Sequence, residues 1–242
     1  MSWVTNTIVF SRSRCRRMTW VANNWDLIAT LTVAHLRQSV LPIFLGLVIA
    51  IPLGWLAFRF RWSRGLILTT SGLMYTIPSL ALFALLPPLL GISFLSTANL
   101  VIALTIYAVA IMVRSVADAL ASIDPNVRAA ATAMGYGPWR RFWAVELPLA
   151  GPVILAGLRV AAVSTISLAT VGILIGVENL GYLFTNGLQR RIVPEVLAGV
   201  VAVMVIALII DLTLAATGRL LMPWAPGRRT RRRGRRARMV TS

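Results

Sequence analysis

The side chains that could carry out acid–base, nucleophilic or metal chemistry are few in this chain of 242 residues. Seven residues are acidic, one is a histidine, one is a cysteine, and all 24 basic residues are arginines. No two carboxylates are placed as a general acid–base pair, and a nucleotide loop of the G-x-x-x-x-G-K-[ST] type cannot form without a lysine. Cys15 alone makes neither an internal disulfide nor a metal cluster, and His35 lies near the start of an apolar segment, where an interfacial position is expected. We therefore expect no catalytic residue, no metal site and no bound cofactor, and the chain is not expected to be an enzyme.

Two charged residues lie well inside apolar segments. At a rise of about 1.5 Å per residue, Arg159 lies about 16 Å and Asp211 about 12 Å from the ends of their segments, on the same side. An unpaired charge at such a depth is costly, so we predict that the two residues form an ion pair. The pair is interpreted as structural, and a role in gating or in a solute path is the alternative. Arg114 and Asp118, one helical turn apart, are predicted to form a local pair near the inner interface.

Long apolar segments must position these charges, because 58% of the residues are hydrophobic and only 13% are charged. A helix needs about 20 apolar residues to cross the roughly 30 Å core of a bilayer. Five segments reach that length, and they cover residues 33–58, 66–90, 98–120, 149–177 and 196–222. The second contains Gly72, Pro78, Pro87 and Pro88, and proline within a span breaks a backbone hydrogen bond. The predicted fold class is therefore all-α, a polytopic helical membrane protein with five spans, or six if the second segment is divided.

Arginines in the links between these segments orient the chain in the membrane. The first and third links carry three arginines each and residues 228–238 carry eight, whereas the second link carries none. By the positive-inside rule the first and third links and the C-terminus are cytoplasmic, and five spans then place the N-terminus outside the cell membrane. Four arginines before Met18 conflict with that orientation, so residues 1–17 are interpreted as an unstructured extension ahead of a start at Met18, with Met1 as the alternative start. Residues 18–224 form the predicted transmembrane domain, and residues 225–242 a disordered cytoplasmic tail that fixes topology, with binding to anionic lipid or nucleic acid as the alternative.

A basic and aromatic cassette at residues 123–148 separates the third and fourth segments. Asp124 is a good helix N-cap, and the run AAATAM that follows makes a short, smooth helix that another protein can approach closely. Gly135 ends that helix at a position suited to a positive φ. The stretch WRRFWAVE predicts a second short helix, with its aromatic residues toward lipid or core and Arg140 and Arg141 toward the headgroups. A helix–glycine–helix hook of this kind is interpreted as a docking element.

The spacing of these residues resembles the EAA loop of ABC-importer permeases, in which the loop forms a coupling helix that inserts into a groove on the ATP-hydrolysing subunit. The resemblance assigns the contact with the ATPase to Ala129, Ala130, Ala131, Met134, Gly135, Leu147 and Pro148. The first position departs from the family, because the family's glutamate is Ala129 here, and Glu146 is too far along the chain to replace it. The resemblance implies a type I ABC-importer permease fold, an ABC ATPase subunit that holds ATP and magnesium, an extracytoplasmic solute-binding protein, and a second permease that is identical or a sister subunit.

Three further stretches look like the osmoprotectant branch of that family, whose solutes are glycine betaine, carnitine, choline or proline. They read YTIPSLALFALLPPLLGI from residue 75, LPLAGPVILAGLRVAAV from residue 147, and ATVGILIG followed by NLGYLF from residue 169. Glu178 and Asn179 stand where that branch commonly has two glycines, and they are expected to narrow or stiffen an outer loop.

A broken span can line a cavity with freed backbone carbonyls and hydroxyls, and aromatic faces suit a quaternary ammonium group. The predicted solute pathway therefore comprises Tyr75, Thr76, Pro78, Ser79 and Tyr107. The nearest alternative is the same kind of importer carrying methionine or another small polar solute. An ATP-independent channel or carrier, and a membrane-anchored nucleic-acid binder, are alternatives from other classes, and neither accounts for the cassette. Membrane lipid is the remaining expected partner.

Overall fold

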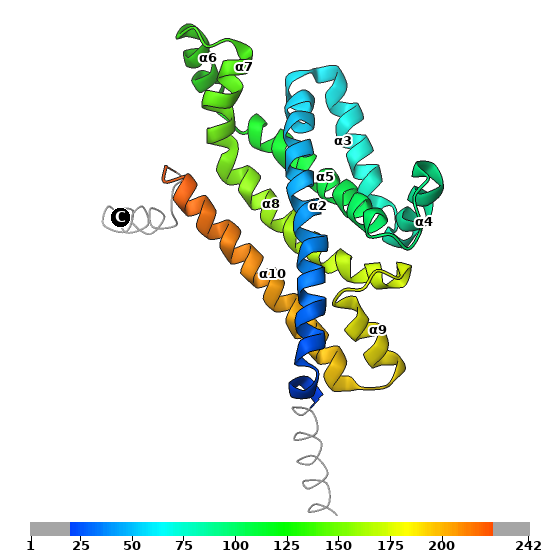
Figure 1. Ribbon diagram of the computed structural model, residues 1–242. Helices are drawn as coiled ribbons and strands as arrows, with labels where there is room; N and C mark the ends of the chain where they lie inside the picture. Colours follow the sequence, from blue (N-terminus) through cyan, green and yellow to red (C-terminus); the bar gives the residue numbers. More distant parts are fainter. Residues whose placement is uncertain (1–19, 225–242) are drawn as a thin grey trace, which may run out of the picture.

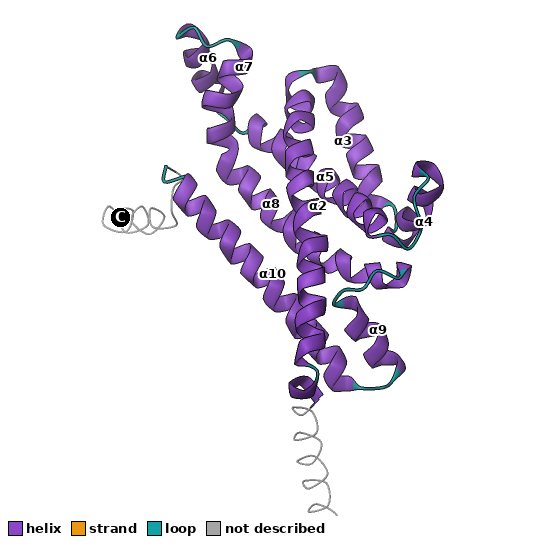
Figure 2. Ribbon diagram, in the orientation of Figure 1, coloured by secondary structure: helices purple, strands orange, loops and turns teal. Residues whose placement is uncertain are grey.

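The computed structural model describes residues 20–224, and over that range the chain consists of helices and loops without a β-strand (Figures 1 and 2). The helices are α2 (Trp25–Arg59), α3 (Arg61–Thr76), α4 (Ser79–Leu90), α5 (Thr97–Ala121), α6 (Pro125–Ala133), α7 (Pro138–Arg141), the π-helix η1 (Phe142–Glu146), α8 (Leu147–Ala169), the 3-10 helix η2 (Thr170–Ile175), α9 (Gly181–Gln189) and α10 (Val193–Leu221). Figure 1 shows α6 and α7 protruding at one end of the molecule, and α9 at the opposite end. The predicted tail at 225–242 and the predicted extension at 1–17 lie outside the described residues.

The membrane-spanning helices agree with the apolar segments of the sequence. Within residues 20–224, four helical runs are long and apolar enough to cross a bilayer: α2, α5, α10 and the run Pro138–Ile175. The remaining predicted segment, the second along the chain, is divided into α3 and α4, whose axes differ by 108°. The all-α membrane fold is confirmed, and the second segment is a bent pair of helices rather than one straight span.

The bend between α3 and α4 has a local cause. Pro78 lacks a backbone N–H and disfavours helical geometry in the residue before it. Ile77 accordingly has extended geometry with φ −65° and ψ 127°, and Pro78 follows with ψ 135°. The hydroxyl of Tyr107 on α5 donates to the carbonyl oxygen of Ile77, which the break leaves without a helical partner. Gly72 lies within α3 and does not interrupt it.

Helix α5 is the centre of the fold, because most of its side chains are buried against α2, α3, α4 or α8. Glycines on α2 let this helix approach α5 closely at two places. A methyl group built on Gly46 would lie 2.5 Å from Cβ of Ala108, and one built on Gly54 would lie 2.6 Å from Cβ of Val116. The rigid unit of the molecule is therefore the α2–α5 pair, which positions the other helices.

Buried polar side chains hold α2 to the segment that follows α8, at the end near α9. The Gln38 amide donates to the carbonyl oxygen of Glu178 at 3.0 Å, and the Asn179 amide donates to Oε1 of Gln38 at 3.1 Å and to the carbonyl oxygen of Ala169 at 2.9 Å. His35, expected at the interface, is instead fully buried, with Nε2 3.1 Å from the carbonyl oxygen of Ile166. The expectation for His35 was wrong because α2 begins at Trp25, so that His35 lies inside the helix and faces α8.

The close approach of α2 and α5 generates a stability prediction. Gly54→Leu should place side-chain atoms where Val116 already packs, and overpacking of this kind costs about 1–3 kcal/mol of folding free energy. Thermal unfolding in detergent, followed by tryptophan fluorescence, should show a midpoint lower by several degrees. Gly72→Leu is the matched control, because nothing lies within 4 Å of a methyl group built at that helical glycine. Equal midpoints for the two variants would contradict the packing described here.

Candidate functional site: a braced helical hook and an ion pair between helices

The protruding segment at residues 124–146, called the hook below, is built by local sequence signals. Asp124 caps α6 as predicted, since its carboxylate accepts from the backbone N–H of Asn126 at 2.8 Å. Gly135 ends the first arm with φ +83°, a conformation that side chains other than glycine rarely adopt. The chain then turns at Pro138 into α7, and η1 runs without a loop into α8. The hook is therefore two short helical arms joined at a glycine, with the second arm continuous with a spanning helix.

The outer surface of the hook is apolar and open. Met134 is 69% exposed at its tip, and Ala129 and Ala130 are also exposed. Ala131, predicted to share that surface, is only 1% exposed and faces inward. Leu147 and Pro148 belong to the first turn of α8 and are half-buried at the base of the hook.

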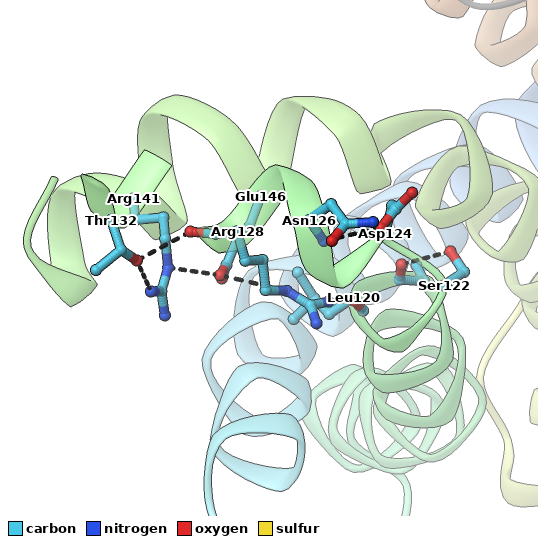
Figure 3. A network of polar contacts seen from close by, with 9 residues as sticks. Leu120, Ser122, Asp124, Asn126, Arg128, Thr132, Arg141 and Glu146 are labelled. Carbon is cyan, nitrogen blue, oxygen red and sulfur yellow. Dashed lines mark hydrogen bonds and ion pairs between the residues drawn. The ribbon is translucent and has the colours of Figure 1, made fainter. Parts of the chain in front are cut away.

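A buried carboxylate braces the two arms of the hook (Figure 3). Glu146, 2% exposed, accepts from Nε of Arg141 at 2.9 Å, and Nε of Arg128 lies 3.6 Å from the same oxygen. Arg141 also donates to Oγ1 of Thr132 at 2.8 Å. Arg128 comes from α6 and Arg141 from α7, so one carboxylate joins both arms to the start of α8.

Arg128 extends this network to the spanning helices. Its guanidinium donates to the carbonyl oxygen of Leu120 at the end of α5, and its carbon Cζ lies 4.5 Å from the centre of the Phe58 ring on α2. Burial of the Glu146 charge is therefore compensated by two arginines, as a buried ion requires. The network fixes the angle of the hook relative to three spanning helices.

One expectation for this segment needs correction, and one residue has a role that was not predicted. Arg141 was expected to face the headgroups, but it points inward to Glu146, while the Arg140 guanidinium lies 4.8 Å from the ring centre of Tyr136. Glu146, which was expected to lie too far along the chain to replace the family's glutamate, is buried and has a different role. The turn at Gly135 folds the second arm back, so the Glu146 carboxylate contacts Arg128, the residue directly before Ala129. Sequence reasoning missed this role, although a single acid within a basic aromatic helix was a signal.

Aromatic side chains attach the hook to α2. The ring of Trp55 lies 5.7 Å from Trp139 and 5.6 Å from Phe142, measured between ring centres. Phe142 is buried, whereas Trp139 and Trp143 are exposed and line an apolar groove against α2. The prediction that these residues face lipid or core is confirmed for Phe142, which lies in the core, and stays a prediction for the two exposed tryptophans.

The structure brings Arg159 and Asp211 together. Arg159 on α8 donates from Nε and Nη2 to the two carboxylate oxygens of Asp211 on α10, each at 2.6 Å, which is a bidentate pair. The side chains are 41% and 25% exposed respectively. Arg114 and Asp118 on α5 also approach, at 3.9 Å, and Arg64 of α3 lies 4.0 Å from the same carboxylate.

The residues predicted to line a solute pathway lie at the α3–α4 break and beside it. Tyr75 is 52% exposed, and its ring lies edge-on to that of Tyr107 with centres 6.3 Å apart. Tyr107 is 3% exposed and its hydroxyl is engaged by Ile77, so it supports the break rather than opening into a cavity. Thr76 and Pro78 are exposed and Ser79 is half-buried, with the Thr76 hydroxyl donating to the carbonyl oxygen of Leu73.

Comparison with known proteins places these features in a family. The family model described as "Binding-protein-dependent transport system inner membrane component" matches residues 42–223. The osmoprotectant import permease protein OsmW of Salmonella typhimurium is 34% identical over 79% of this chain and 90% of its own length. The glycine betaine/carnitine/choline transport system permease protein OpuCB of Bacillus subtilis is 31% identical over 85% of this chain and 94% of its own. Among solved structures, an inward-facing MetNI methionine ABC transporter chain shares the fold, with a TM-score of 0.76 and 19% identity over 82% of this chain and 98% of that one.

The Glu146 brace can be tested on the isolated chain. Glu146→Ala leaves two largely buried arginines without their carboxylate, and removing one member of a buried ion pair costs about 3–5 kcal/mol. The hook should open, and trypsin should cleave after its arginines at least tenfold faster than in the unmodified chain. Glu178→Ala is the control, because that acidic residue is exposed and lies at the other end of the molecule. Unchanged cleavage in Glu146→Ala would show that the hook does not depend on this carboxylate.

The ion pair between α8 and α10 makes a second prediction. Asp211→Ala leaves Arg159 as an uncompensated cation at membrane depth, whereas Arg159→Leu combined with Asp211→Leu removes both charges. The yield of folded protein in the membrane should fall far more for the single change than for the double change. Equal losses would contradict a pairing that is needed to neutralise the charges.

Proposed function

The chain belongs to the family of binding-protein-dependent transport system inner membrane components, and from this premise we propose that its hook is the contact for a separate ATP-hydrolysing subunit. The chain is the membrane-embedded permease of such a system and not an enzyme in its own right. In the proposal, ATP and magnesium are held by the partner ATPase. The residues proposed to make the contact are Ala129, Ala130, Met134 and Gly135, with Leu147 and Pro148 at the base of the hook.

The observation that carries this proposal is the exposed apolar tip of a hook that is braced from within. Exposed apolar surface rimmed by charge marks a protein interface, and Met134 at 69% exposure lies beside exposed small residues. Ala131 packs inward and supports the tip from behind. Because η1 leads into α8 without a loop, force applied at the tip is transmitted to the spanning helix that carries Arg159.

The proposed assembly contains two permeases, two ATPase subunits and an extracytoplasmic solute-binding protein. One chain with four spans and a bent pair among its described residues does not enclose a gated path by itself, so a second permease, identical or a sister, is part of the proposal. Closure of the two ATPases draws the two hooks together, and the attached helices rock between an inward-facing and an outward-facing arrangement. The hook would lie in the cytoplasm with the C-terminus, and the N-terminus outside.

The proposed solute is a compatible solute with a quaternary ammonium group, such as glycine betaine, choline or carnitine; proline, which lacks that group, is a further candidate. Two relatives that cover most of this chain are named for osmoprotectant or glycine betaine/carnitine/choline transport. The exposed ring of Tyr75 at the α3–α4 break, with Thr76, Pro78 and Ser79 beside it, offers an aromatic face to such a cation. The alternative is methionine or another small polar solute, since the structural neighbour belongs to a methionine transporter but is similar in fold alone.

The test is uptake of labelled glycine betaine into proteoliposomes that contain this permease, its ATPase and its binding protein. Gly135→Trp forces a bulky residue into φ +83°, which costs about 1–3 kcal/mol and blocks the tip, so ATP-dependent uptake should fall at least tenfold and the ATPase should no longer co-purify. Gly91→Trp is the matched control, because Gly91 has φ +66°, open space around it, and a place away from the hook at the end of α4.

Each outcome of this experiment has a definite meaning. Loss of uptake in Gly135→Trp but not in Gly91→Trp supports the hook as the ATPase contact. ATP-dependent uptake of methionine but not glycine betaine keeps the importer and discards the osmoprotectant assignment. Uptake that is indifferent both to ATP and to Gly135 would mean that the chain acts as a channel or carrier.

A further inference from the structure

We infer that the Arg159–Asp211 pair is a transit site for zwitterionic solutes, meaning small molecules with one carboxylate and one ammonium group. The inference rests on the proposed function, because it assumes that solute passes through a path bounded by this chain. It goes further by assigning the recognition of both charges of the solute to two residues. Arg159 would bind the carboxylate, and Asp211 would attract the ammonium.

The pair lies at membrane depth on both of its helices. Arg159 is twelve residues beyond the start of α8 at Leu147, or about 18 Å along the axis, and Asp211 is ten residues before the end of α10 at Leu221, or about 15 Å. Apolar residues dominate both helices on either side. Neither charge can therefore reach a headgroup region by a short shift of its side chain.

The exposure of the pair is the unexpected feature. A charge pair that only joined two helices would be expected in their contact, yet Arg159 is 41% and Asp211 25% exposed. Charged groups within a membrane face a bundle interior or a water-filled cavity rather than lipid. The face shared by α8 and α10 at this level is therefore turned away from lipid, and the inference assigns it to the aqueous path between the two proposed permeases.

The chemistry of the pair matches a zwitterion. The bidentate bond uses Nε and Nη2 of Arg159 and leaves Nη1 to donate to a further carboxylate. The carboxylate of Asp211 can attract a quaternary ammonium by charge alone, without a hydrogen bond. Because the pair is neutral overall, it neither traps nor repels a molecule of net charge zero. A site in a transport path must be weak enough for the solute to leave it, and two groups that already satisfy each other meet that condition.

Motion of the hook would act directly on this site. Arg159 lies on α8, which is continuous with the hook, whereas Asp211 lies on α10, which packs against α8 but is connected to it along the chain through η2 and α9. A shift of α8 relative to α10 would lengthen the two 2.6 Å contacts and free both groups for solute. The site would thus bind solute weakly through Nη1 of Arg159 while the pair is intact, and more strongly while the helices move apart.

The test compares two solutes that share a trimethylammonium group and differ in the carboxylate: glycine betaine, which has one, and choline, which has none. ATP-dependent uptake is measured in proteoliposomes with the full complex. The variants are the double change Arg159→Leu with Asp211→Leu, and a control double change, Arg114→Leu with Asp118→Leu, at the ion pair on α5. Dividing each rate by that of the unmodified complex cancels the preference of the binding protein. The double change at the α8–α10 pair should lower kcat/KM at least tenfold for glycine betaine and less than threefold for choline, and the control should lower neither.

Other results would overturn the inference in recognisable ways. An equal fall for both solutes, with normal assembly and ATPase activity, would assign the pair a structural role only. Preserved glycine betaine uptake in the double variant would exclude the site. If the unmodified complex takes up methionine instead, the solute proposed above is wrong, and methionine compared with its decarboxylated amine gives the same test, because methionine is also a zwitterion. A complex that takes up only cations would contradict the inference, whereas loss of ATP dependence alone would contradict the proposed coupling and leave the selectivity comparison valid.

Discussion

The core of a bilayer offers no water to a polar group, and this condition determines where most polar contacts of the chain are found. The carbonyl oxygen that the break at Pro78 frees accepts from a tyrosine hydroxyl, and the amide of Asn179 donates both to the Gln38 side chain and to the last carbonyl oxygen of α8. The two charges between α8 and α10 satisfy each other. At these places a residue from elsewhere in the fold supplies the partner that the irregular backbone lacks.

The same condition divides the molecule into parts of different mobility. Helices α2 and α5 pack backbone to backbone through small residues and form a frame that has little freedom to deform. Helix α10, in contrast, has only 11% of its most apolar window buried within the chain, and α8 continues directly into the braced hook. The α2–α5 frame is rigid, α8 is connected to the hook, and α10 is loosely packed. This combination suits a repeated movement of α8 relative to α10 that does not unfold the chain.

Hydropathy and proline positions were enough to predict the spans, because length and polarity decide whether a helix can cross a bilayer. An interruption of the second segment was predicted as well, with Pro78 as one of four candidates, but Gly72, Pro87 and Pro88 lie within helices. The angle of 108° at the break is a property of the packed helices that the local sequence does not encode. The pairing of Arg159 with Asp211 followed from depth, since an isolated charge there is costly. The inward role of Glu146 was missed because its partners lie 5 and 18 residues away and meet it only through the turn at Gly135. The burial of His35 was missed for a related reason, since the true start of α2 was not visible in the apolar pattern.

The π-helix η1 has a consequence for the direction of the hook. A π-helix pairs each residue with the one five positions along, and it occurs mostly as a single turn within an α-helix. Here it forms the end of the hook that runs into α8, and its last residue is Glu146. Gaining or losing one residue at this point would turn α7 by about 100° around the axis of α8, and the contacts of Glu146 with Arg128 and Arg141 would be broken. The register of η1 therefore sets both the direction of the tip and the position of the carboxylate that holds the two arms together.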